Sequence, residues 1–201
     1  YERVQKLKQK YLKWEEIPIN ASNLSVPEVV GCKEHIQLAN DVYRQGITIL
    51  QNKRNILPLS SSSEHRVLVV YPENRFTMQV EDKKYAALSL GHIVQKIHPA
   101  ADVAVLLNPP CKEEVEQIKV KAENYDTIII GTLTVLPGDP LITLIEELNK
   151  TNQNIIVVAM RSPYDLAFLP DVPVYVCTYE FTYPALNIAV KALYGIEKVS
   201  G

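Results

Sequence analysis

The sequence lacks the residues from which several common kinds of site are built. Its 201 residues include seven glycines and three cysteines, and neither of the phosphate-cradling patterns GxGxxG and GxxxxGKS/T occurs. The cysteines are far apart, without the CxxC pairs of zinc or redox sites. The GxSxG pattern around the nucleophile of α/β-hydrolases is missing too. We therefore expect no cofactor, no metal ion and no serine nucleophile of these kinds.

The sequence also lacks a large excess of charge of either sign, and it lacks long apolar runs. Lys and Arg number 21 against 23 Asp and Glu, which gives a formal net charge of −2. A protein that binds nucleic acid by neutralising phosphates needs a basic excess, so a nucleic-acid partner is not expected. No apolar run approaches the roughly 18 residues of a membrane-spanning helix, so no membrane partner is expected either. With 47% hydrophobic and 22% charged residues, the composition is that of a globular domain.

Short apolar runs alternate with segments of helical periodicity. The runs VLVVY, TIIIG and NIIVVAM do not alternate between apolar and polar residues, which indicates strands covered on both faces. We therefore predict an α/β fold, a three-layer α/β/α sandwich with a mostly parallel sheet. The expected strands are 47–50, 67–71, 103–107, 127–131, 155–160 and 174–177, and the expected helices are 2–13, 35–44, 86–97, 112–123, 140–150 and 183–194.

In such a sheet ligands bind beyond the carboxyl ends of the strands, so the residues there are the site candidates. Arg75 and Arg161 follow predicted strands and are able to meet an anionic ligand, although solvated or ion-paired arginine is the commoner outcome. Glu180 follows the last strand, but glycoside hydrolysis ordinarily requires a pair of carboxylates. Asp165 follows Ser162 and Pro163, and this pattern favours a structural role at a helix start.

The four histidines do not form a metal-ligand pattern. His92 and His98 are six residues apart, which places them on different faces of a helix, unlike the spacing in HExxH. We interpret the histidines as surface or capping residues.

Several segments, taken together, resemble one family. Their order along the chain is similar to that of the second domain of family 3 glycoside hydrolases, in the branch that contains β-N-acetylglucosaminidases. One departure is Gln51, where that family usually has lysine. The segments are HIQLANDVYRQGITILQNKRNILPL at 35–59, YDTIIIGT at 125–132, AMRSPYDL at 159–166, VCTYE at 176–180 and AVKALYG at 189–195.

The resemblance implies a domain organisation and a partner. Residues 1–30 would be the remnant of the last helix of a preceding TIM barrel plus a linker, and 31–201 the sandwich. In the family the catalytic aspartate lies on the barrel, and in this branch a histidine of the barrel is the acid/base. None of those motifs occurs in the chain. The resemblance therefore implies that this domain packs on the barrel, is inactive alone, and lines the substrate cleft at most, with Arg75, Arg161 and Glu180 as candidates.

Two alternatives remain open from the sequence. The chain could be a carbohydrate-binding or partner-docking module, which would need exposed aromatic rings. It could also supply an acid/base glutamate to a β-glucosidase-like parent, with Glu73 and Glu180 as candidates. The aromatic candidates near strand ends are Tyr71, Phe76, Tyr179 and Phe181.

Overall fold

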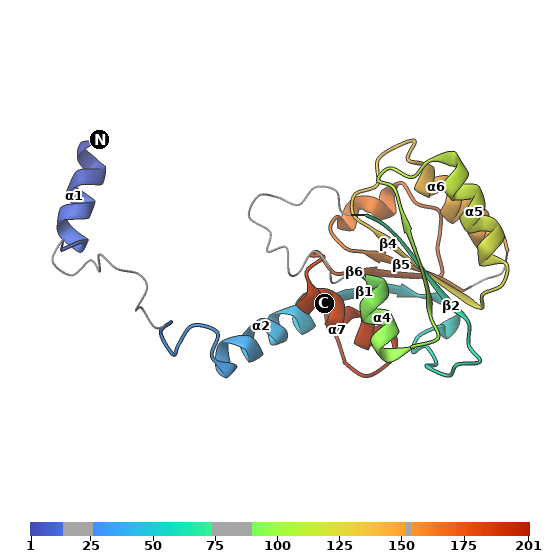
Figure 1. Cartoon of the computed structure of the whole chain (residues 1–201), viewed down its shortest axis with the longest axis horizontal. Coiled ribbons are helices and arrows are strands. Elements are labelled where there is room, and N and C mark those ends of the chain that lie inside the picture. Colours follow the sequence, from blue (N-terminus) through green and yellow to red (C-terminus); the bar gives the residue numbers. More distant parts are fainter. Residues whose placement is uncertain (14–25, 74–89, 152–153) are drawn as a thin grey trace. The chain divides into compact units, whose positions relative to one another are not determined.

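The computed structural model describes residues 1–13, 26–73, 90–151 and 154–201. The chain divides into two compact units, Tyr1–Gln37 and Leu38–Gly201. Helix α1, Glu2–Tyr11, belongs to the first unit, whereas α2, Lys33–Gly46, begins in the first unit and ends in the second (Figure 1). Both helices form where the apolar spacing predicts them.

The described residues of the second unit form one sheet of six strands in the order β1-β6-β5-β4-β2-β3. Strands β2 to β6 pair in parallel, and β1 pairs with β6 in the antiparallel direction at one edge. The mostly parallel sheet is thus confirmed. The strands are β1 Thr48–Asn52, β2 Val67–Pro72, β3 Asp102–Leu106, β4 Thr127–Thr132, β5 Asn154–Ala159 and β6 Val174–Cys177.

Helices cover both faces of this sheet, because successive residues of each strand point to opposite sides. Val69 and Ile129 pack with the helices α4, Leu90–Ile97, and α7, Tyr183–Leu193. On the other face, Leu68 and Ile128 pack with α5, Lys112–Ala122, and α6, Pro140–Asn149. The three-layer sandwich is therefore confirmed (Figure 1). The expected helix start at 86 lies outside the described residues.

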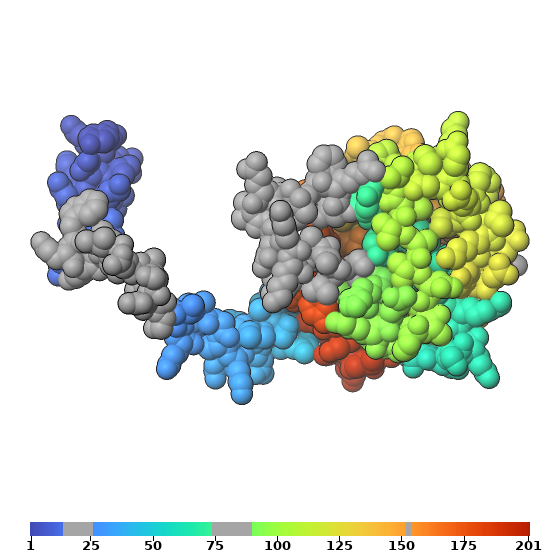
Figure 2. Space-filling model, in the orientation of Figure 1, coloured from blue at the N-terminus to red at the C-terminus, as the bar shows by residue number. Residues whose placement is uncertain are grey.

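Every residue of β2, β4 and β6 is buried, as the uninterrupted apolar runs predict. In the space-filling view the green and yellow-green atoms of residues 90–123, which include α4, β3 and α5, form much of the visible surface (Figure 2). The approach of α4 to the sheet depends on Gly91. A Cβ atom at that position would lie 2.6 Å from Cγ1 of Val103 and 3.1 Å from Cε1 of Tyr71. Glycine therefore lets the helix pack directly against β2 and β3.

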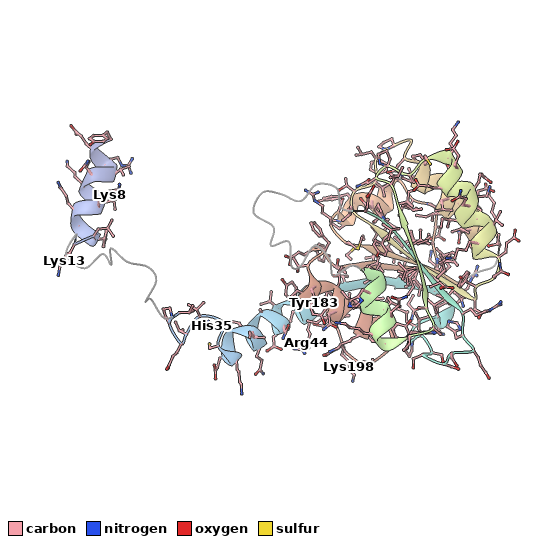
Figure 3. All side chains as sticks on the ribbon, viewed as in Figure 1. Lys8, Lys13, His35, Arg44, Tyr183 and Lys198 are labelled. Carbon is pink, nitrogen blue, oxygen red and sulfur yellow. The ribbon has the colours of Figure 1, made fainter. Side chains whose placement is uncertain are left out.

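The segment that follows α7 is held against α2. The Arg44 guanidinium donates hydrogen bonds of 3.0 and 3.2 Å to the carboxylate of Glu197, and one of 2.8 Å to Asp41. The amide of Ser200 also donates to the carbonyl oxygen of Arg44, at 3.1 Å. Arg44 and Lys198 mark this region in Figure 3. These contacts attach the end of α2 to the sandwich.

The strand order places a switch point at β2. The chain goes from β2 to β3 at one edge, and then returns past β2 to β4 on its other side. The connections that leave the carboxyl ends of neighbouring strands diverge at such a point, which leaves a crevice between them. The fold therefore predicts a ligand site at the carboxyl end of the sheet.

Candidate functional site

An open hollow of about 670 Å³ lies at the carboxyl end of the sheet. Three connections provide its walls, namely those that follow β3, β4 and β5. The residues that line it are Asn108 after β3, Leu133 and Thr134 after β4, and residues 161–164 after β5. The hollow therefore lies beyond the carboxyl ends of the strands, the side of the sheet on which the fold predicts a ligand.

Arg161 is the one sequence candidate that the structure places in this hollow. Its side chain is exposed, and among the described residues it makes no hydrogen bond or ion pair. Arg75 lies outside the described residues. With respect to the described part of the chain, the Arg161 guanidinium is therefore available to an external acceptor.

Tyr164 lines the same hollow and was missed by the sequence reasoning. Its side chain is 79% exposed, an unusual state for a large aromatic ring beside a crevice. Tyr164 lies in the short 3₁₀ helix η4, Pro163–Ala167, directly after the helix-starting proline. The sequence signal was present in RSPYD, where a tyrosine follows a proline at a strand end, but the segment was interpreted only as a helix start.

Asp165 holds two walls of the hollow together. Its carboxylate is 1% exposed and accepts hydrogen bonds from the Thr132 hydroxyl, at 2.6 Å, and from the Val135 amide, at 3.0 Å. The sequence predicts a structural role for Asp165 at a helix start, whereas the bonds that it makes run from η4 to the end of β4 and to the connection after it. Both donors are buried with it, so the carboxylate fixes the position of one loop relative to the other.

Glu180 accepts a hydrogen bond from a residue of α2. The hydroxyl of Tyr43 on α2 donates a hydrogen bond of 2.7 Å to Oε2 of Glu180. Burial raises the pKa of Tyr43, and the bond to Glu180 raises it further. Glu180 is half-buried and is not among the described residues that line the hollow. The structure therefore does not bring Glu180 and Arg161 into one site.

The aromatic candidates for sugar stacking differ in how far their rings are exposed. Tyr71 is only 7% exposed and Phe181 packs against the core, so both are core residues and neither presents a ring for stacking. Tyr179 is 49% exposed, with a positive φ of 60°. Phe76 lies outside the described residues. Of the described aromatic rings named here, that of Tyr164 lines the hollow, whereas those of Tyr71, Tyr179 and Phe181 do not.

His98 corrects another sequence expectation, because it is fully buried at the amino end of the sheet. Its Nδ1 lies 3.4 Å from the Tyr194 hydroxyl, and its Nε2 has no hydrogen-bond partner among the described residues. Burial lowers the pKa of His98, and the neighbouring His65 lowers it further. His65 itself lies 3.0 Å from the hydroxyl of Thr127. The pair belongs to the packing of the amino end, far from the connections that form the hollow.

No group of three or more His, Cys, Asp or Glu side chains in the described ranges is placed to hold a metal ion. No helix in the same ranges is long and apolar enough to cross a membrane.

Comparison with solved structures identifies the fold. The chain is similar over its whole length to part of a glycoside hydrolase family 3 β-N-acetylglucosaminidase from Paenibacillus sp., with 23% identity and a TM-score of 0.78. It is similar over 98% of its length to a fungal multi-domain β-N-acetylglucosaminidase of the same family, with 21% identity and a TM-score of 0.74. A β-glucosidase from Listeria innocua matches 96% of the chain with 12% identity and a TM-score of 0.69. No family model and no curated protein matches the sequence.

These similarities define an α/β sandwich of the kind found in family 3 glycoside hydrolases. The fold that the resemblance implied is thereby confirmed. The chain spans 37% of the Paenibacillus protein and 22% of the fungal one. It therefore corresponds in fold to one part of a much longer chain in these relatives.

Proposed function

We propose that the chain is the second domain of a longer family 3 glycoside hydrolase, and that the whole protein removes terminal β-N-acetylglucosamine from cell-wall or chitin-type glycans. One observation carries the proposal: the match to a β-N-acetylglucosaminidase extends over the entire chain at a TM-score of 0.78. In this proposal residues 1–30 are the end of a preceding barrel domain and the linker from it, and residues 31–201 form the sandwich.

Exposed apolar side chains support a covering partner. On α1, Val4, Leu7 and Tyr11 follow helical spacing, yet each is more than half exposed and the helix has no buried residue. On α2, Leu38 and Val42 are 63% and 61% exposed. Apolar helix faces of this kind are stable in water when another surface covers them. The partner we propose for them is the catalytic barrel of the same chain.

The chemistry of the hollow supports a non-catalytic role. Hydrolysis of a glycosidic bond ordinarily uses two carboxylates, one as acid/base and one as nucleophile or base. None of the described residues that line the hollow is a carboxylate. Asp165 is buried behind the wall with both oxygens occupied, and Glu180 is bonded to Tyr43. We therefore propose that bond cleavage takes place on the barrel, and that this domain supports the barrel and borders its substrate cleft.

The proposal is tested by the size and activity of the natural protein. An antibody to the chain should detect a band in source cells well above 22.7 kDa, with room for a barrel of about 250 residues. That protein should release the aryl group from an aryl β-N-acetylglucosaminide, and the purified 201-residue chain should not. Turnover by the purified chain, or a natural product near 22.7 kDa, would contradict the proposal.

The acid/base alternative has its own test. If this domain supplied the acid/base, Glu180→Gln in the whole protein would abolish the hydrolysis of a substrate with a poor leaving group. Because Glu180 is bonded to Tyr43, we expect the variant to retain the wild-type rate. A loss of rate on that substrate, together with rescue by added azide on a substrate with a good leaving group, would establish Glu180 as the acid/base.

A further inference from the structure

The hollow combines an exposed aromatic ring with a cation that has no ion-pair partner among the described residues. Arg161 and Tyr164 are three residues apart on the connection after β5, and both line the hollow. Two of the other arginines are ion-paired: Arg44 with Asp41 and Glu197, and Arg66 with Asp126. Arg161 has no such partner among the described residues. A planar guanidinium with its donors free is suited to a carboxylate, which it binds through two parallel hydrogen bonds.

The ring of Tyr164 is held in the open by its neighbours in the chain. Pro163 fixes the backbone immediately before it, and Asp165 is anchored immediately after it by the bonds to Thr132 and Val135. The side chain between these anchors is 79% exposed. A ring that is presented on a fixed backbone loses little conformational freedom when a ligand binds, and this favours affinity.

The other residues that line the hollow limit the kinds of ligand that could bind there. Asn108, Thr134 and Ser162 are neutral polar residues that can exchange hydrogen bonds with hydroxyl or amide groups. Leu133 and Pro163 add apolar surface. A polyanion such as a nucleotide or a nucleic acid would need several cations, whereas the described lining has one. A sugar ring has an apolar face of C–H groups, a rim of hydroxyls and, in acidic sugars, one carboxylate.

We propose that this hollow is a binding subsite for a pyranose that carries a carboxylate. The carboxylate pairs with the Arg161 guanidinium, and the apolar face of the sugar ring stacks on Tyr164. Asp165 is a positioning residue, because it fixes the wall that carries both side chains without facing the ligand. The inference goes beyond the proposed function, since the subsite is defined by these contacts and not by the reaction of the whole protein.

The test compares two tetrasaccharides that differ in charge. Hyaluronan tetrasaccharide contains N-acetylglucosamine and a carboxylate-bearing sugar, and chitotetraose contains only the neutral sugar. Binding of each to the 201-residue chain is measured by calorimetry and by NMR titration at low and high salt. We expect the acidic tetrasaccharide to bind about tenfold more tightly, because it gains a charge-assisted pair with Arg161.

Two variants and two controls locate the site. Arg161→Gln should remove the preference for the acidic tetrasaccharide, and Tyr164→Ala should weaken binding of both by about fivefold. Arg3→Gln and Tyr11→Ala change exposed residues of the same types on α1 and should leave both affinities unchanged. The thermal unfolding of each variant is followed to show that it remains folded.

Three results would overturn the inference: no binding of either tetrasaccharide, equal binding of both, or an unchanged preference in Arg161→Gln. These outcomes are separate from the proposed function, which is judged by the size and turnover of the natural protein. Binding at the hollow in a protein that does not cleave β-N-acetylglucosaminides would leave the subsite standing and refute the proposed function.

Discussion

The hydroxyl of Tyr43 donates to the carboxylate of Glu180 over 2.7 Å, although the two residues are 137 positions apart in the chain. One lies on α2, the helix by which the chain enters the sandwich, and the other on the connection between β6 and α7. The bond therefore attaches the entry helix to the end of the sheet at which the strands finish. It also gives the Glu180 side chain a structural partner.

Tyr43→Phe should lower the free energy of unfolding by about 1 kcal/mol, because it removes one hydrogen bond to a half-buried carboxylate. The measurement is urea denaturation followed by circular dichroism. Tyr11→Phe is the matched control, since Tyr11 is 68% exposed on α1, and it should unfold at the wild-type midpoint. Equal midpoints for wild type and Tyr43→Phe would show that the bond contributes nothing.

Gly91→Ala should destabilise the sandwich by about 1–3 kcal/mol, because overpacking forces stiff side chains out of their rotamers. The added Cβ would lie 2.6 and 2.7 Å from the two γ-carbons of Val103, a β-branched residue that yields little. Gly46→Ala is the control, with no atom within 4 Å of its Cβ. Adding Val103→Ala to Gly91→Ala should recover part of the loss, and a purely additive double variant would refute the clash.

Asp165→Ala should cost about 3 kcal/mol, because it leaves the buried Thr132 hydroxyl and Val135 amide without an acceptor. Asp165→Asn preserves the shape and should cost less, since one oxygen can still accept. Both are measured by denaturation, and Asp171→Asn, an exposed carboxylate, serves as the control. In NMR spectra the amides of residues 133–135 should shift in both Asp165 variants. If they do not move, Asp165 does not hold that wall.

His98 should make stability depend on pH. Burial and the neighbouring His65 lower its pKa in the folded protein below the ordinary value of 6.5. The unfolded chain therefore binds a proton at His98 more tightly than the folded protein does. The contribution of neutral His98 to the free energy of unfolding is present in full above the pKa of the unfolded chain. It is lost as the pH falls through the folded pKa.

The free energy of unfolding should accordingly decrease as the pH falls from about 7 through the range in which histidine titrates, beyond the decrease due to the carboxylates. His98→Gln should have a shallower pH slope than wild type over this interval, whatever its stability at neutral pH. The exposed His92 provides the control, and His92→Gln should retain the wild-type slope. Identical slopes in all three proteins would remove His98 as the cause.

The sheet could be predicted from the sequence because a strand that is buried on both faces consists of apolar residues at nearly every position. The run VLVVY is apolar at every position, and all of β2 is indeed buried. Segments such as 112–123 and 140–150 also contain their helix signals locally, and both helices form within a residue of the expected ends. The fold class therefore needed no information from distant contacts.

The site could not be predicted in the same way, because it depends on which segments meet. Arg161 was placed correctly beyond a strand, but nothing local shows that Asn108 lines the same hollow. The burial of His98 requires Tyr194, almost a hundred residues later, to close over it. Asp165 could be assigned a structural role from its helix-start pattern, but its bond to Thr132 follows only from the strand order.

The pairing of β1 with β6 has a consequence for how the molecule is assembled. Thr48 lies opposite Cys177 and Asn52 opposite Val174, so the strand nearest the start of the sheet-forming sequence has its neighbour near the end. During synthesis β1 cannot pair with β6 until more than a hundred further residues have been made, and until then its backbone groups on that side have no partner in β6. Such a long-range closure slows folding and leaves an open sheet edge in the meantime. Of the described strands, β1 is therefore made first, but it can pair with β6 only after β6, the last of them, has been made.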